Sequence, residues 1–123
     1  MNTPKKIQKI VNQRITDKHG FICCTGCGIR LNLSYSHLVK KISLVDCLNY
    51  QKPENITLHC FGDSWKCHEK WESNLYSKMS TLHDFQENMK RIKELDIYYF
   101  FRLISRFKDQ GVGIGILTEL ENL

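Results

Sequence analysis

Residues 21–72 read FICCTGCGIRLNLSYSHLVKKISLVDCLNYQKPENITLHCFGDSWKCHEKWE, and this stretch contains every cysteine of the 123-residue chain. It begins with a tight Cys-x-x-Cys-Gly turn, in which two residues separate Cys24 from Cys27. Cys60 and Cys67 form a second pair, separated by the six residues FGDSWK. Two cysteine pairs are typical of a closed tetrahedral site with four thiolate ligands. We therefore expect a structural metal ion to hold this stretch together.

Zinc is the ion expected in such a site, and a set of disulfide bonds is the competing interpretation. The number of cysteines, six, is even, as a disulfide framework would also require. The first residues, MNTPKKIQKIV, include lysines but no apolar segment of the kind that a secretion signal needs. We therefore expect a cytoplasmic protein, in which metal sites are commoner than disulfides. Cys23 could replace Cys24 as a ligand, although the geometry of the turn favours Cys24.

The positive charge is concentrated in the first part of the chain. The net charge of +5 divides into +7 for residues 1–52, with nine Lys or Arg against two acidic residues, and −2 for residues 53–123, with nine against eleven. A basic half suits a polyanion such as nucleic acid, although a mildly basic soluble surface has the same composition. The candidate contacts to phosphate are Lys5, Lys6, Lys9, Lys40 and Lys41.

Hydrophobic periodicity predicts helices at both ends of the chain. Residues 1–20 have apolar side chains at helical spacing and end at Gly20, which predicts an N-terminal helix packed on the core. Residues 80–110 predict a second helical segment, either one long helix or two helices broken at Asp96. Residues 111–123 begin with three glycines in five positions, which predicts a loosened Gly-rich tail.

The middle segment, residues 21–79, is expected to be the metal module. Alternation of apolar and polar residues predicts a strand over 29–38, and short strands are expected at 21–23 and 55–59. A helix is expected to begin at residue 66 or 67. The predicted fold class is therefore α+β, with a metal-stapled module between helical ends.

Three polar side chains accompany the cysteines in a fixed order. His37 follows a predicted strand, Asn55 begins the next one, and His68 directly follows Cys67. Together with CTGCG (24–28), SHL (36–38), ENITLHC (54–60) and CHEKWE (67–72), this order resembles the HNH nuclease family, especially its small phage-type members. The resemblance covers roughly residues 20–75 and implies a ββα-metal fold.

The resemblance also implies a metal-dependent endonuclease that hydrolyses phosphodiester bonds of DNA or RNA. His37 would be the general base that deprotonates the attacking water, since neutral imidazole is available near pH 7. Asn55 would hold the loop and orient His37. His68 would ligate a catalytic divalent metal such as Mg²⁺.

One position departs from the family pattern. Many members have an acidic metal ligand directly before the base histidine, where this chain has Ser36. Glu72 lies four residues after His68, so the two share one face of a helix and could chelate one ion. Glu69 and His59 are the alternative ligands.

Two other functions would use the same scaffold. A catalytically impaired HNH-derived protein would keep the zinc core and bind nucleic acid or a host nucleoprotein, for example as a phage counter-defence, anti-CRISPR-like inhibitor of a host nuclease. A zinc-stapled protein-interaction module would instead work through the aromatic residues of 80–110. We expect no association with membranes, and the apolar C-terminal stripe leaves both a monomer and a homodimer open.

Overall fold

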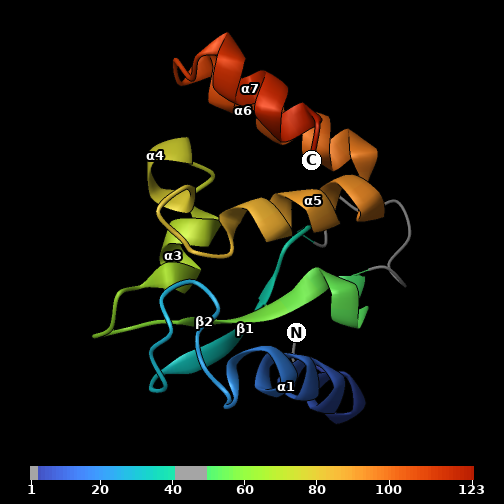
Figure 1. The fold of residues 1–123 in the computed structure, drawn as a ribbon, viewed down its shortest axis with the longest axis vertical. Helices are drawn as coiled ribbons and strands as arrows, with labels where there is room; N and C mark the ends of the chain where they lie inside the picture. Colours follow the sequence, from blue (N-terminus) through green and yellow to red (C-terminus); the bar gives the residue numbers. More distant parts are fainter. Residues whose placement is uncertain (1–2, 41–49) are drawn as a thin grey trace.

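The computed structural model describes residues 3–40 and 50–123. The elements in chain order are α1 (Lys5–His19), β1 (Leu33–His37), the short 3-10 helix η2 (Pro53–Asn55), β2 (Ile56–Cys60), α3 (Cys67–Glu72), α4 (Tyr76–Met79), α5 (Phe85–Leu95), α6 (Ile97–Asp109) and α7 (Ile114–Glu121) (Figure 1). The predicted α+β class is confirmed for these residues. None of the helices in this part of the chain has the length and hydrophobicity that crossing a membrane requires.

A two-stranded antiparallel sheet lies at the centre of the molecule. β1 and β2 pair from Leu33 opposite Cys60 to His37 opposite Ile56. Every residue of β2 is buried, because α1 lies on one side of the sheet and α3 and α5 lie on the other (Figure 1). The side chains of one strand alternate between the two faces of a sheet. β2 therefore presents one set of side chains to α1 and the other set to the helices that follow.

Two hydrophobic cores meet at the sheet. The smaller core joins α1 to β2 through Val11, Ile15, Cys23, Ile56 and Leu58. The larger core contains Cys24, Cys60, Cys67 and Trp71 together with the aromatic side chains of α5 and α6, among them Phe85, Phe100 and Phe107. The cysteines therefore lie in the same core as the C-terminal helices.

The strand expected at 55–59 is found at Ile56–Cys60, but the other two predicted strands are shortened or absent. Only Leu33–His37 of the segment 29–38 is a strand, and residues 21–23 form none. The reason is the cysteine turn, in which the backbone N–H of Cys24 donates to the carbonyl oxygen of Ile29 (2.8 Å) and folds the chain back on itself. Asn32, with φ of 55°, then redirects the chain into β1.

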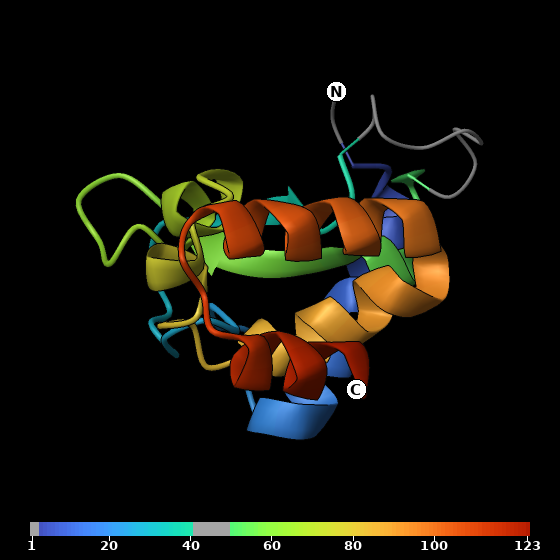
Figure 2. The ribbon, with the colours of Figure 1, turned by 90° about the horizontal axis from the view of Figure 1, so that it is seen from above.

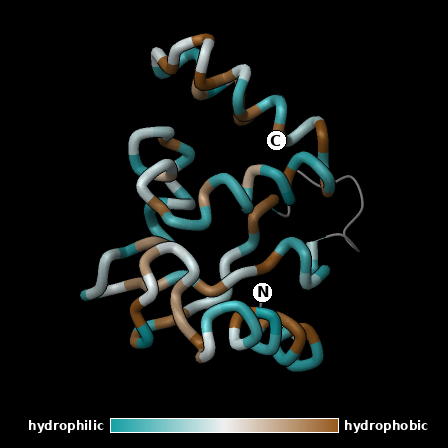
Figure 3. Tube along the Cα trace, in the orientation of Figure 1, coloured by the Kyte–Doolittle hydropathy of each residue, from teal (hydrophilic) through white to brown (hydrophobic). Residues whose placement is uncertain are grey.

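The C-terminal segment consists of separate helices. α5 and α6 are broken at Asp96, whose extended backbone ends one helix and whose carboxylate accepts from Tyr99 N–H to begin the next. The prediction of a Gly-rich tail is wrong, because Ile114–Glu121 forms α7. α7 packs beside α6 (Figure 2), and its Leu117 and Leu120 are buried. Figure 3 shows hydrophobic positions interspersed with hydrophilic ones along both helices. Burial of this apolar face outweighs the poor helix propensity of the glycines.

Candidate metal centre and polar site

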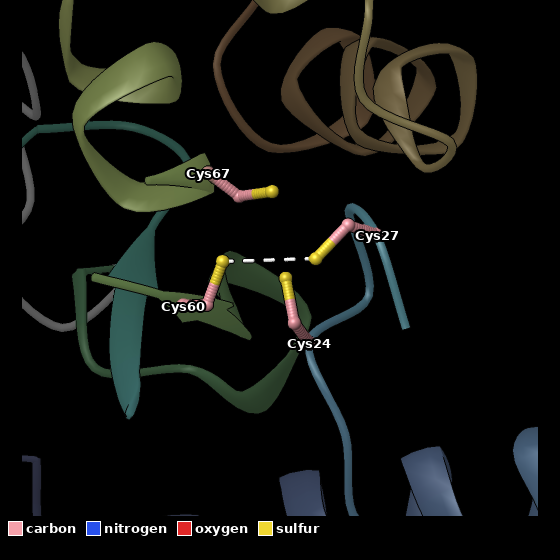
Figure 4. Close-up of side chains that lie close together, drawn as sticks. All are labelled: Cys24, Cys27, Cys60 and Cys67. Atoms are coloured by element: carbon pink, nitrogen blue, oxygen red, sulfur yellow. Dashed lines mark hydrogen bonds between the residues drawn. The ribbon is translucent and has the colours of Figure 1, made fainter. Parts of the chain in front are cut away.

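Four thiols converge at one point between the cysteine turn and α3 (Figure 4). The Sγ atoms of Cys24, Cys27, Cys60 and Cys67 all lie within 4.8 Å of one another. The Sγ atoms of Cys27 and Cys60 are 3.7 Å apart. A tetrahedral zinc site with Zn–S bonds of about 2.3 Å has sulfur–sulfur edges of about 3.8 Å. The four cysteines therefore have the spacing that a zinc ion needs, and they could hold a metal.

Two glycines give the turn its shape. Gly28 has φ of 88°, a conformation that favours glycine, and its N–H donates to the carbonyl oxygen of Cys24 (2.8 Å). Gly26 donates its N–H to Cys24 Sγ (3.3 Å), as expected for a turn whose amides face sulfur. A Cβ added at Gly26 would lie 3.0 Å from Cys67 Sγ, so a side chain there would push the second cysteine pair away.

The six residues between Cys60 and Cys67 form the loop that the ligand spacing requires. Gly62 and Lys66 have φ of 68° and 60°, which reverses the chain twice within the loop. Phe61 N–H donates to the carbonyl oxygen of Asn32 (2.8 Å), which fixes the loop beside β1. α3 then begins at Cys67 and places its thiol in the cluster.

The proximity of the thiols changes their acidities in opposite directions. A hydrogen bond from Cys67 lowers the pKa of Cys24 to about 4, against the effect of burial. Burial and the neighbouring charge of Cys24 raise the pKa of Cys27 to about 11. The hydrogen bond to Cys24, followed by burial, raises the pKa of Cys67 still further. Only a bound cation would allow all four thiols to be thiolates at this spacing.

Cys23 lies outside this cluster. Its side chain is 1% exposed and packs in the smaller core with Val11 and Ile56. Burial raises the pKa of its thiol, with Cys24 adding to the effect. Between the two candidates for the first ligand, the structure thus brings Cys24 to the metal centre.

His37, at the end of β1, is held from two sides. Its ring stacks on Tyr50, with centroids 4.0 Å apart and an interplanar angle of 3°. Its Nε2 lies 3.1 Å from Gln51 Oε1. Burial lowers the pKa of His37, although the hydrogen bond to Gln51 acts in the opposite direction.

Asn55 is fully buried and joins the chain segments around His37. Its Oδ1 accepts from Val39 N–H (2.7 Å), and its Nδ2 donates to the carbonyl oxygens of Val39 (3.1 Å) and Tyr50 (3.0 Å). The side chain therefore fixes the residue two positions after His37 and the residue that stacks on its ring.

His68 and Glu72 have different partners in the structure. Ser36 Oγ lies 2.7 Å from His68 Nδ1, whereas Glu72 Oε2 lies 3.4 Å from Lys40 Nζ. The charges of Glu72 and His68 both affect the pKa of His37, after burial and the Gln51 hydrogen bond, so the three groups are within electrostatic range. Among the described residues, the four cysteines are the only group of three or more His, Cys, Asp or Glu placed to hold an ion.

The candidate phosphate contacts are spread over two places. The lysines of α1, Lys5, Lys6 and Lys9, are exposed on its surface. Lys40 is half-buried and pairs with Glu72. Lys41 lies outside the described residues.

A buried polar cluster, which sequence reasoning missed, lies behind His68. Ser36 and His59 are fully buried, and Asp84 is 6% exposed. The signal available in the sequence was alternation, because Ser36 pairs with Thr57 and lies diagonal to His59 on the same face of the sheet. Nothing local could have indicated Asp84, which lies 25 residues after His59.

Comparisons with known proteins do not assign a family to this α+β chain and its four-cysteine centre. No protein-family model matches the chain, and no curated protein or solved structure does so either. The function has to be inferred from the residues themselves.

Proposed function

We propose that the protein is a metal-dependent endonuclease of the HNH type, in which a zinc-stapled ββα-metal module hydrolyses phosphodiester bonds of DNA or RNA. The observation that carries this proposal is the hydrogen bonding of Asn55. It joins Val39 to Tyr50, and Tyr50 stacks on His37, as expected if Asn55 orients a general base.

The hydrogen bond of His37 suits the role of a base. The amide oxygen of Gln51 can only accept, so Nε2 of a neutral His37 carries the hydrogen. Nδ1 then has the lone pair that can take a proton from water. A half-buried, stacked ring of fixed orientation meets the geometric requirement of general base catalysis.

The zinc ion that we assign to the four cysteines would have a structural role. Four thiolates close the coordination sphere and leave no position for water or substrate. The centre connects the cysteine turn to the first residue of α3, and His68 is the next residue. Zinc would thereby fix the position of His68 relative to the sheet.

His68 is the side chain that fits a catalytic divalent cation best. In the described part of the chain, its Nδ1 is engaged by Ser36 while Nε2 has no hydrogen-bond partner. Glu72 can contribute a carboxylate only if its ion pair with Lys40 opens. A divalent cation held there would stabilise the charge that develops on the phosphate and on the leaving oxygen.

A second function is favoured by that same ion pair. Because Glu72 is bound to Lys40, His68 is the only one of the two proposed metal ligands that is free to bind a cation. This is expected of an HNH-derived protein that has lost catalysis. Such a protein would bind nucleic acid or a host nucleoprotein, for instance as a phage counter-defence factor.

A cleavage assay distinguishes the two functions. Zinc-loaded protein is incubated with supercoiled plasmid or single-stranded RNA and Mg²⁺, Mn²⁺ or Ni²⁺, and His37→Ala is compared with wild type. His19→Ala, an exposed histidine at the end of α1, is the matched control. The endonuclease predicts cleavage that His37→Ala abolishes and His19→Ala retains. Salt-sensitive binding without cleavage in every metal would refute it and support the binding protein.

A further inference from the structure

A continuous chain of hydrogen bonds leads from His68 into the core. His68 Nδ1 lies 2.7 Å from Ser36 Oγ, and Ser36 Oγ lies 3.0 Å from His59 Nδ1. His59 Nε2 lies 3.0 Å from Asp84 Oδ2, which also accepts from the hydroxyl of Thr25 (2.6 Å). Ser36 and His59 come from the two strands of the sheet, and Thr25 comes from the cysteine turn. Asp84 is the N-cap of α5.

Ser36 gives the chain of hydrogen bonds a direction. A hydroxyl has a single hydrogen, so Ser36 can donate to only one of the two imidazoles and has to accept from the other. It is fully buried and lies between two ring nitrogens, so it is not placed to act as a nucleophile.

Asp84, at the inner end of this chain of hydrogen bonds, decides which imidazole donates to Ser36. Asp84 Oδ2 lies within hydrogen-bond distance of both the Thr25 hydroxyl and His59 Nε2. Burial raises the pKa of this carboxyl, but the hydrogen bonds lower it, so the carboxylate is ionised and accepts from both groups. His59 Nε2 therefore carries a hydrogen. If His59 is neutral, its Nδ1 accepts from Ser36, and Ser36 in turn accepts from His68 Nδ1–H. A protonated imidazole at His59 would donate through Nδ1 as well and reverse the chain of hydrogen bonds, so the direction is measured at pH 8, above the ordinary histidine pKa of about 6.5.

We propose that Ser36, His59 and Asp84 are positioning residues that hold His68 in the tautomer with its hydrogen on Nδ1 and its lone pair on Nε2. This inference rests on the proposed function of His68 as a ligand of a divalent cation. It also gives Ser36 a role in place of the missing acidic ligand. An outer partner that fixes the tautomer of a ligating histidine raises its affinity for metal.

The reverse arrangement would have the opposite consequence. If Ser36 donated to His68 Nδ1, neutral His68 would carry its hydrogen on Nε2 and would have no lone pair for a cation. The two directions of the chain therefore predict different tautomers of His68, which can be observed directly.

The tautomer is read by long-range ¹H–¹⁵N NMR correlations of the imidazole rings. The full-length, zinc-loaded protein is measured at pH 8, and the signals of His68 are assigned with His68→Asn. We expect the Nδ1–H pattern for His68 in the wild type. In Ser36→Ala this preference should be lost, whereas Ser36→Thr, which retains a hydroxyl, should keep it. The control is Ser34→Ala, which removes a hydroxyl of the same strand that contacts a backbone carbonyl.

Binding of Mn²⁺, followed by EPR, is a second readout that does not depend on cleavage. Ser36→Ala is expected to weaken binding by about 10- to 100-fold, as outer-shell substitutions do. Ser36→Thr and Ser34→Ala are expected to bind like the wild type. Zinc content and circular dichroism of each variant show whether it is folded, and the tautomer of His68 in the wild type serves as the test if Ser36→Ala is not.

The outcomes for the inference and for the proposed function are separate. An Nε2–H tautomer in wild type, or an unchanged tautomer in folded Ser36→Ala, would overturn the inference even if the protein cleaves DNA. An Nδ1–H tautomer that depends on Ser36 would support it. If such a protein neither bound Mn²⁺ nor cleaved, the endonuclease would be refuted while the positioning of His68 would stand.

Discussion

Cys23 and Cys24 are adjacent in the sequence but belong to different cores, since one packs against α1 and the other faces the metal centre. Cys24→Ala removes one of the four cysteines to which we assign zinc, and we expect this variant to bind no zinc. A loss of about 3 kcal/mol or more would follow, because binding of structural zinc contributes to folding. For a chain of this size, that lowers the melting temperature by roughly 10 °C.

Cys23→Ala is the matched control for this prediction. It removes a buried thiol of the same size that lies in the other core, so about one zinc per chain should remain, as a four-thiolate site requires. Elemental analysis and thermal melting measure both variants. Zinc retained in Cys24→Ala and lost in Cys23→Ala would show that the first ligand has been assigned to the wrong cysteine.

The environment of His37 determines the pH range in which it can act as a base. Burial lowers its pKa, and protonation of the ring removes the base, so activity should fall only at a pH below the ordinary histidine value of about 6.5. The hydrogen bond to Gln51 acts in the opposite direction, so Gln51→Ala should move this acid limb to still lower pH. Single-turnover cleavage rates of the wild type and of Gln51→Ala, measured as a function of pH, test whether the acid limb of the variant lies at the lower pH. An acid limb above pH 6.5 would argue against His37 as the base.

At the scale of the elements, the break between α5 and α6 depends on one cap. Asp96 Oδ1 accepts from Tyr99 N–H (3.0 Å) at the first turn of α6. Asp96→Ala should therefore destabilise the protein by about 1 kcal/mol, the usual cost of losing an N-cap. Asp109→Ala, at the other end of the same helix, removes an equal charge from an exposed site and should cost much less. Urea denaturation compares the two, and equal effects would mean that charge, not capping, is responsible.

Local sequence signals predicted these elements only in part. The end of α1 at Gly20 was confirmed, because a left-handed cap is a property of the residue itself. α7 was missed, since its stability comes from the contacts of Leu117 and Leu120 with other helices and not from its own glycine-containing sequence. The choice between one and two C-terminal helices stayed open in the sequence, although the cap at Asp96 that decides it is local.

The candidate site shows the same division. The four cysteines could be chosen from their spacing, because a tight turn brings two ligands together without help from the rest of the fold. The chain from His68 to Asp84 could not, because it needs the register of the sheet and the position of a helix that comes later in the sequence. Spacing along the chain indicates local pairs, whereas long-range pairs require the structure.

At the scale of the whole molecule, the four-cysteine cluster and the C-terminal helices share one core. Cys24, Cys60 and Cys67 are buried together with Phe100 and Phe107. Removal of zinc by a chelator should therefore loosen α5, α6 and α7 as well as the sheet. We expect a large loss of helical circular dichroism and its recovery when zinc is added back. If the helices kept their native melting temperature without zinc, the two regions would fold independently.

The final prediction follows from the uneven distribution of charge along the sequence. Lys5, Lys6 and Lys9 are exposed on α1, in the half of the chain that carries the positive charge. If each contacts a phosphate, replacing all three by alanine should reduce the slope of log K against log salt for duplex DNA by about 2.7, from about 0.9 for each phosphate contact. The control is the triple variant with Lys78, Lys90 and Lys108 changed to alanine, since both variants lower the net charge from +5 to +2. Fluorescence anisotropy at several salt concentrations measures the slopes. Equal slopes in the two variants would show that nucleic acid responds to the total charge of the protein and that α1 is not the contact surface.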